Sequence, residues 1–171
     1  MSKENDARII EQSERLKDAL PRLSDYMWKW VNKMPEHNAF MYHDVPITYK
    51  KFSEDVEQVA KYLLKLGIKK GDRVGFLLTV RPEYNVFSLA AAMIGAIAVG
   101  MNTRYTVPEM SYVMKHSQPR VILALHGLGD VNYQEMLSKA MEATYQFDKV
   151  IVVNGPAELP NAITLEEVLA G

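Results

Sequence analysis

The stretch that decides the fold spans residues 71–106 and reads GDRVGFLLTVRPEYNVFSLAAAMIGAIAVGMNTRYT. After a Gly-Asp turn, residues 73–79 form an apolar run of strand length, a pattern typical of a strand covered on both faces. Pro82 can open a helix because a first helical residue needs no N–H partner, and Gly95 can end that helix. Residues 96–101 form a second short apolar run. The stretch therefore predicts a strand, a helix and a second strand parallel to the first.

Apolar runs of strand length alternate with amphipathic stretches of helical spacing along the rest of the chain. The predicted elements are an amphipathic arm over 3–20, a helix capped by Ser24, a hairpin over 39–48, helices over 49–66, 106–116 and 131–144, strands over 121–125 and 149–153, and a short helix capped by Thr164. This alternation predicts an α/β fold with a mainly parallel sheet and helices on both faces, preceded by a helical arm and a small hairpin.

Composition narrows the possible functions. The 171 residues carry a formal net charge of −1, from 20 Lys and Arg against 21 Asp and Glu, so no positive field favours nucleic acid. The chain has no cysteine, and its four histidines show no metal-ligand spacing, so we predict no metal site. The longest apolar stretch, residues 86–101, is too short to span a bilayer. The polar first residues contain no signal-peptide core, and we expect a cytoplasmic protein.

Several motifs, taken in order, resemble the N-terminal region of the acyl-CoA synthetases, which belong to the adenylate-forming superfamily. The similar segments are Ile47-Thr48-Tyr49-Lys50-Lys51-Phe52, Leu66-Gly67-Ile68-Lys69-Lys70-Gly71-Asp72-Arg73-Val74, Pro82-Glu83-Tyr84, Gly95-Ala96-Ile97-Ala98-Val99 and Asn102-Thr103-Arg104-Tyr105-Thr106. The chain departs from the family pattern at Lys51, Arg81, Gly100 and Met101, and we expect none of these departures to affect chemistry. The resemblance implies a partial AMP-binding domain over 24–171, after an N-terminal arm over 1–23.

The resemblance also implies a reaction. Acyl-CoA synthetases use ATP and Mg²⁺ to convert a carboxylic or fatty acid into an acyl-adenylate, and they then transfer the acyl group to coenzyme A. The family's Ser/Thr/Gly-rich phosphate loop with Pro-Lys-Gly is not present in this sequence. We therefore expect these 171 residues to be inactive alone, to contain no catalytic residue and to bind no cofactor tightly. The expected partners are the remainder of the ligase chain and, through an exposed apolar face, a second copy.

Arg104 is the single candidate for ligand contact. It follows a predicted strand, precedes the helix cap at Thr106 and resembles the family arginine near the phosphate-bearing end of coenzyme A. The alternative is an arginine that pairs with a carboxylate or covers apolar surface. Glu54 and Asp55 are expected on a solvated helix face, where general acid/base catalysis is improbable.

Two other functions stay open at this point. The chain could be a stand-alone binding or interaction module with the synthetase fold but without its chemistry. Residues 126–132, His-Gly-Leu-Gly-Asp-Val-Asn, follow a predicted strand and precede a predicted helix, which is the context of a nicotinamide-binding loop using Gly127 and Gly129. Asn132 stands where the third glycine of that loop belongs, so the motif is weak.

Overall fold

The computed structural model describes residues 20–143 and 147–171. Its central feature is a five-stranded sheet in the order β4-β3-β5-β8-β9, in which every neighbouring pair is parallel. The strands are β3 (Arg73–Leu77), β4 (Ile97–Gly100), β5 (Val121–Leu125), β8 (Lys149–Val153) and β9 (Ala162–Thr164). The predicted parallel sheet is confirmed.

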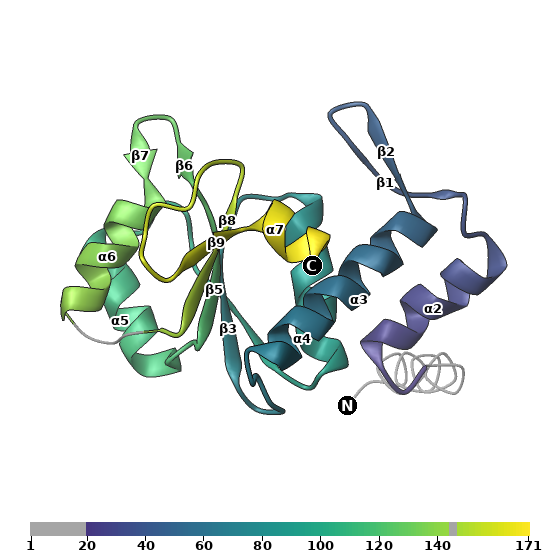
Figure 1. The fold of residues 1–171 in the computed structure, drawn as a ribbon, viewed down its shortest axis with the longest axis horizontal. Helices are drawn as coiled ribbons and strands as arrows, with labels where there is room; N and C mark the ends of the chain where they lie inside the picture. Colours follow the sequence, from purple (N-terminus) through teal and green to yellow (C-terminus); the bar gives the residue numbers. More distant parts are fainter. Residues whose placement is uncertain (1–19, 144–146) are drawn as a thin grey trace, which may run out of the picture.

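Helices cover both faces of this sheet (Figure 1). On one face lie α3, α4 and α7, and on the other lie α5 and α6, while α2 packs against the outer side of α3 and α4. The helices are α2 (Leu23–Lys33), α3 (Tyr49–Lys65), α4 (Pro82–Met93), α5 (Val107–Ser117), α6 (Tyr133–Ala143) and α7 (Leu165–Ala170). The layered α/β class predicted from the sequence is therefore confirmed.

The core lies on both sides of β5, the middle strand. All five residues of β5 are buried, which explains why its sequence is apolar throughout rather than alternating. Leu63 of α3 and Phe87 of α4 are fully buried on one side, and Leu137 of α6 is fully buried on the other. Burying such side chains contributes about 1.5–3 kcal/mol each. The sheet therefore rests on apolar packing from both layers.

Two small antiparallel hairpins stand outside the main sheet. The first joins β1 (Asn38–Tyr42) to β2 (Val45–Thr48), and its two-residue turn places His43 and Asp44 at φ 47° and 61°. Such a left-handed pair matches the twist of hairpin strands. The second joins β6 (Gly127–Leu128) to β7 (Val131–Asn132). The hairpin predicted over 39–48 is confirmed, while the second hairpin was not predicted.

The structure corrects several predicted boundaries. Ser24 is not a helix cap: it lies inside α2, and the backbone N–H of Arg22 donates to the Asp25 carboxylate at 3.1 Å instead. Helix α6 begins at Tyr133, not at residue 131, because β7 takes the two preceding residues. Strand β9 was not predicted, since three residues are too few to show a period. The predicted arm over 3–20 lies outside the described residues, apart from its last residue.

Two glycines with the same backbone angle allow a stability test. Gly67 and Gly95 both have φ +75°, which L-residues rarely adopt. An added Cβ meets nothing within 4 Å at Gly67 but lies 2.9 Å from Cγ of Lys70 at Gly95. We expect Gly67→Ala to cost about 1–2 kcal/mol and Gly95→Ala about 1 kcal/mol more. Urea unfolding measures both; equal losses would contradict the crowding at Gly95.

Candidate functional site

The topology defines which edge of the sheet can hold a ligand. From β3 the chain crosses by α4 to β4 on one side, and it then returns by α5 to β5 on the other side of β3. In open α/β sheets, ligands bind outside the carboxyl ends of the strands at such a reversal of direction. The segments that follow these strand ends are 78–81, 102–104 and 126, and they form the candidate site.

Arg104 lies at this edge, directly after β4. Its backbone N–H donates to Oδ1 of Asn102 at 2.9 Å, which holds the loop in a turn, and its side chain is exposed. Within the described part of the chain, its guanidinium has no carboxylate partner and no hydrogen bond. Among the described residues, the carboxylate-paired alternative is therefore not found. An unpaired guanidinium at this edge can receive an anion.

The neighbouring helix end is already occupied. At the start of α5, the Glu109 carboxylate accepts from both the backbone N–H and the hydroxyl of Thr106, each at 2.7 Å. The backbone hydrogen bond, followed by the hydroxyl, lowers the pKa of Glu109. The negative side chain of Glu109 already lies against the positive end of α5. This helix end therefore attracts an incoming phosphate less strongly. Anion binding at this edge would depend on Arg104 itself.

A buried tyrosine holds the loop that carries Arg104. The Tyr133 side chain is 1% exposed, and its hydroxyl donates to the carbonyl of Thr103 at 3.0 Å. Because Tyr133 opens α6, this bond ties the β4–α5 loop to a helix 30 residues away. Nothing in the sequence signalled this bond, since a buried tyrosine hydroxyl can find many partners. The guanidinium therefore extends from a fixed loop.

His126, Gln134 and the loop after β8 form a second polar cluster at the same edge. Gln134, 1% exposed, directs Nε2 at Nδ1 of His126 (3.1 Å) and at the carbonyl of Pro156 (2.8 Å). Its Oε1 accepts from the backbone N–H groups of Glu158 and Leu159. All the amide's capacity is thus used inside the fold. We interpret the cluster as structural, and sequence reasoning missed Gln134.

The geometry argues against the nicotinamide-binding alternative. A Cβ at Gly127 would lie 2.5 Å from the carbonyl oxygen of Val131, so this glycine accommodates its own β6–β7 hairpin. At the start of α6, Oδ1 of Asn132 accepts from the backbone N–H groups of Gln134 and Glu135. A dinucleotide loop instead leaves its helix N–H groups for a pyrophosphate. Residues 126–132 do not have that arrangement.

The remaining candidates are not brought together. Glu54 is exposed on α3, whereas the Asp55 side chain is only 17% exposed and pairs with Nζ of Lys51 at 2.5 Å. The predicted solvated position is therefore right for Glu54 and wrong for Asp55. In the described ranges, no three His, Asp or Glu side chains are placed to hold a metal ion. Among the described helices, none combines the length and apolarity that crossing a bilayer requires.

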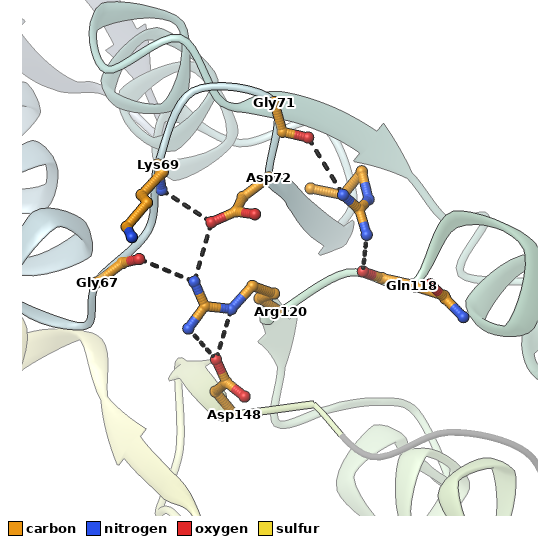
Figure 2. A network of polar contacts seen from close by, with 8 residues as sticks. Gly67, Lys69, Gly71, Asp72, Gln118, Arg120 and Asp148 are labelled. Atoms are coloured by element: carbon orange, nitrogen blue, oxygen red, sulfur yellow. Dashed lines mark hydrogen bonds and ion pairs between the residues drawn. The ribbon is translucent and has the colours of Figure 1, made fainter.

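The opposite, amino edge of the sheet is closed by Arg120 (Figure 2). Its Nη1 donates to the carbonyl of Gly67 at 2.8 Å and to Oδ2 of Asp72 at 2.9 Å, and its Nε donates to Oδ2 of Asp148 at 2.8 Å. These partners come from the segments just before β3 and β8, while Arg120 precedes β5. One guanidinium therefore joins the starts of three strands.

An α/β domain of this kind, with one braced edge and one edge open to ligands, is common to many nucleotide-dependent enzymes. A sequence model of the family described as AMP-binding enzyme matches residues 27–169. Because this match covers most of the chain, the chain belongs to the AMP-binding enzyme family. The resemblance to the N-terminal region of an acyl-CoA synthetase is thereby confirmed.

Named relatives of the chain are acyl-CoA ligases. The medium-chain acyl-CoA ligase ACSF2, mitochondrial, of Homo sapiens is 27% identical over 153 residues, which cover 82% of this chain and 25% of the relative. The long-chain-fatty-acid–CoA ligase FadD13 of Mycobacterium tuberculosis is 38% identical over 80 residues, which cover 47% of this chain and 16% of the relative. This chain spans a quarter or less of their length.

Solved structures share the fold. The acetoacetyl-CoA synthetase of Streptomyces lividans matches 88% of this chain and 25% of its own, with a TM-score of 0.78 at 18% identity. The benzoate CoA ligase of Burkholderia xenovorans matches 88% of this chain and 28% of its own, with a TM-score of 0.73 at 22% identity. At these identities the likeness establishes the fold alone.

Two arginines allow a matched test of the network in Figure 2. Arg120→Ala leaves the acceptors at Gly67, Asp72 and Asp148 without their shared donor, and we expect a loss of about 1–2 kcal/mol for this partly exposed group. Arg104→Ala removes an exposed side chain and should change stability by less than about 0.5 kcal/mol. Urea unfolding compares them; equal effects would contradict the network's role.

The same network predicts acid sensitivity. The N–H of Lys69, followed by the guanidinium of Arg120, lowers the pKa of Asp72 below its usual 3.8. A carboxyl whose pKa is lowered by folding adds stability above its unfolded pKa, and that stability is lost as the pH falls through the lower, folded pKa. Asp72→Asn should therefore destabilise the chain at neutral pH and progressively less below about pH 4. A pH-independent loss in urea unfolding would contradict this account.

Proposed function

We propose that this chain is the N-terminal part of an ATP-dependent acid–CoA ligase, which converts a carboxylic or fatty acid, ATP and coenzyme A into acyl-CoA, AMP and pyrophosphate. The observation that carries the proposal is the family match over residues 27–169 in a chain that spans a quarter or less of its named relatives. Within such a ligase, this part supplies a rigid parallel sheet and one edge of loops that face ligand.

The described residues fit one of the required cofactors in part. Arg104 gives an exposed, unpaired cation on a fixed loop, which suits a phosphate of coenzyme A. The described residues do not fit Mg²⁺ or the ATP phosphates, because they offer neither a cluster of carboxylates nor a glycine-rich loop opening a helix. We therefore assign ATP binding and all bond-making steps to the rest of the ligase.

The coenzyme A contact is tested in the whole ligase with Arg104→Ala. Loss of one charge-assisted hydrogen bond should raise KM for coenzyme A roughly tenfold and leave kcat little changed, because the bond is present before and during the reaction. Lys139→Ala is the control: it removes an exposed lysine of α6 that pairs with Glu135. An unchanged KM in the Arg104 variant would remove the assignment.

Catalysis by the 171 residues alone tests the other half of the proposal. Adenylation needs backbone amides, a cation and Mg²⁺ gathered around the phosphates, and the described residues do not supply that set. We expect no exchange of radioactive pyrophosphate into ATP by the purified chain in the presence of medium- and long-chain fatty acids. Exchange above the buffer control would show that the chain holds a complete adenylation site.

The cytoplasmic location remains a prediction from the sequence. The human relative is named as mitochondrial, which gives a reason to test it. Fluorescence microscopy of the whole protein in its own cells is the direct measurement.

A further inference from the structure

A cavity lies beside the candidate site, and Arg81 of the 78–81 segment lines it. It has a volume of about 450 Å³ and is bounded by the β1–β2 hairpin, the first half of α3, the start of α4, and α7. The apolar side chains that line it are Val45, Ile47, Phe52, Val86, Leu165 and Leu169. A cavity of this size and lining is suited to apolar groups.

The two basic side chains around this cavity, Lys51 and Arg81, are already paired. Arg81 makes two hydrogen bonds to the Glu83 carboxylate, at 3.0 and 3.2 Å, and its guanidinium lies 5.3 Å from the ring centre of Tyr42. Lys51 pairs with Asp55 across one helical turn. A free fatty acid would need an unpaired cation for its carboxylate, and neither basic side chain offers one.

The overall charge points the same way. Glu166 also lines the cavity, so three carboxylates face two cations there. An anionic occupant is disfavoured by this balance.

The departure from the family pattern at Arg81 has a structural role. The Arg81 guanidinium lies over the ring of Tyr42, and this contact joins the hairpin to the start of α4.

The hairpin itself is only half covered. Phe40 packs edge-on against Phe52 of α3 with ring centres 4.9 Å apart, which partly covers one face. Because side chains alternate along a strand, Met41 and its cross-strand partner Pro46 lie on the other face, and Met41 is 61% exposed. Val45, at the cavity mouth, is also 61% exposed. The hairpin thus packs against α3, as a two-stranded hairpin requires for stability, and leaves an apolar side open.

We propose that the cavity and the open side of the β1–β2 hairpin together form the seat on which the rest of the ligase polypeptide docks, through an apolar segment without net negative charge. This inference rests on the proposed function, under which roughly three quarters of the ligase lies outside this chain. An apolar lining, basic side chains that are already paired and a half-covered hairpin match a protein segment better than a small acid. The seat is thus an interface within one enzyme.

The absence of cysteine makes this seat directly testable. Val45→Cys places one thiol at the cavity mouth, and Lys61→Cys places one later on α3, where the lysine side chain is 70% exposed. Each variant is treated with a thiol-alkylating reagent, both as the 171-residue chain and as the whole ligase, and mass spectrometry follows the peptide that carries the new cysteine. We expect labelling at position 45 to be at least about tenfold slower in the whole ligase, with little change at position 61.

The outcomes separate the two proposals. Equal labelling of position 45 in both forms would overturn the seat, as would equal protection of both positions, which would show burial that is not specific to the cavity. Circular dichroism of each variant confirms that it is folded. Acyl-CoA formation by the unsubstituted whole ligase is measured alongside: its failure would overturn the proposed function, whatever the labelling shows.

Discussion

Three strands of the sheet depend on one guanidinium. Arg120 lies between segments that are 53, 48 and 28 residues away along the chain, and its hydrogen bonds hold the starts of β3, β5 and β8 in register. Apolar packing alone would bury these strands without specifying which neighbours pair, because their sequences are similarly apolar. The charged network at the amino edge supplies a directional constraint that apolar side chains cannot.

This arrangement separates stability from ligand contact along the strand axis. At the amino edge, the side chains of Arg120 and Asp72 are bound to each other and to backbone groups. At the carboxyl edge, the Arg104 guanidinium is exposed and without a partner among the described residues, although Tyr133 holds its loop in place. A braced edge lets the other edge carry exposed polar groups without loosening the sheet.

The sequence predicted those parts of the fold whose signals are local. Thr48 and Gly67 bound α3 as expected, and the apolar runs at 121–125 and 149–153 are strands β5 and β8. Local patterns could not predict the buried bonds of Gln134 and Tyr133, because all their partners except His126 are 22 to 30 residues away. The strand β9 and the β6–β7 hairpin were not predicted, because strands of two or three residues are too short to show a hydrophobic period.

The candidate site, too, was predictable only where its signal is local in the sequence. Arg104 was found because it stands in a motif, and the structure adds that its guanidinium has no carboxylate partner within the described ranges. The contact of the Arg81 guanidinium with the Tyr42 ring and the cavity beside it depend on the approach of the hairpin to α4, which a sequence does not display. Long-range contacts of this kind set both the brace at the amino edge and the seat proposed for the rest of the ligase.

We propose that this chain is one part of a longer ligase, and sequencing the coding DNA beyond the codon for Gly171 tests this proposal. We expect an open reading frame that soon encodes a Ser/Thr/Gly-rich loop with Pro-Lys-Gly. A stop codon directly after Gly171 would contradict it, and the stand-alone binding module would become the leading interpretation.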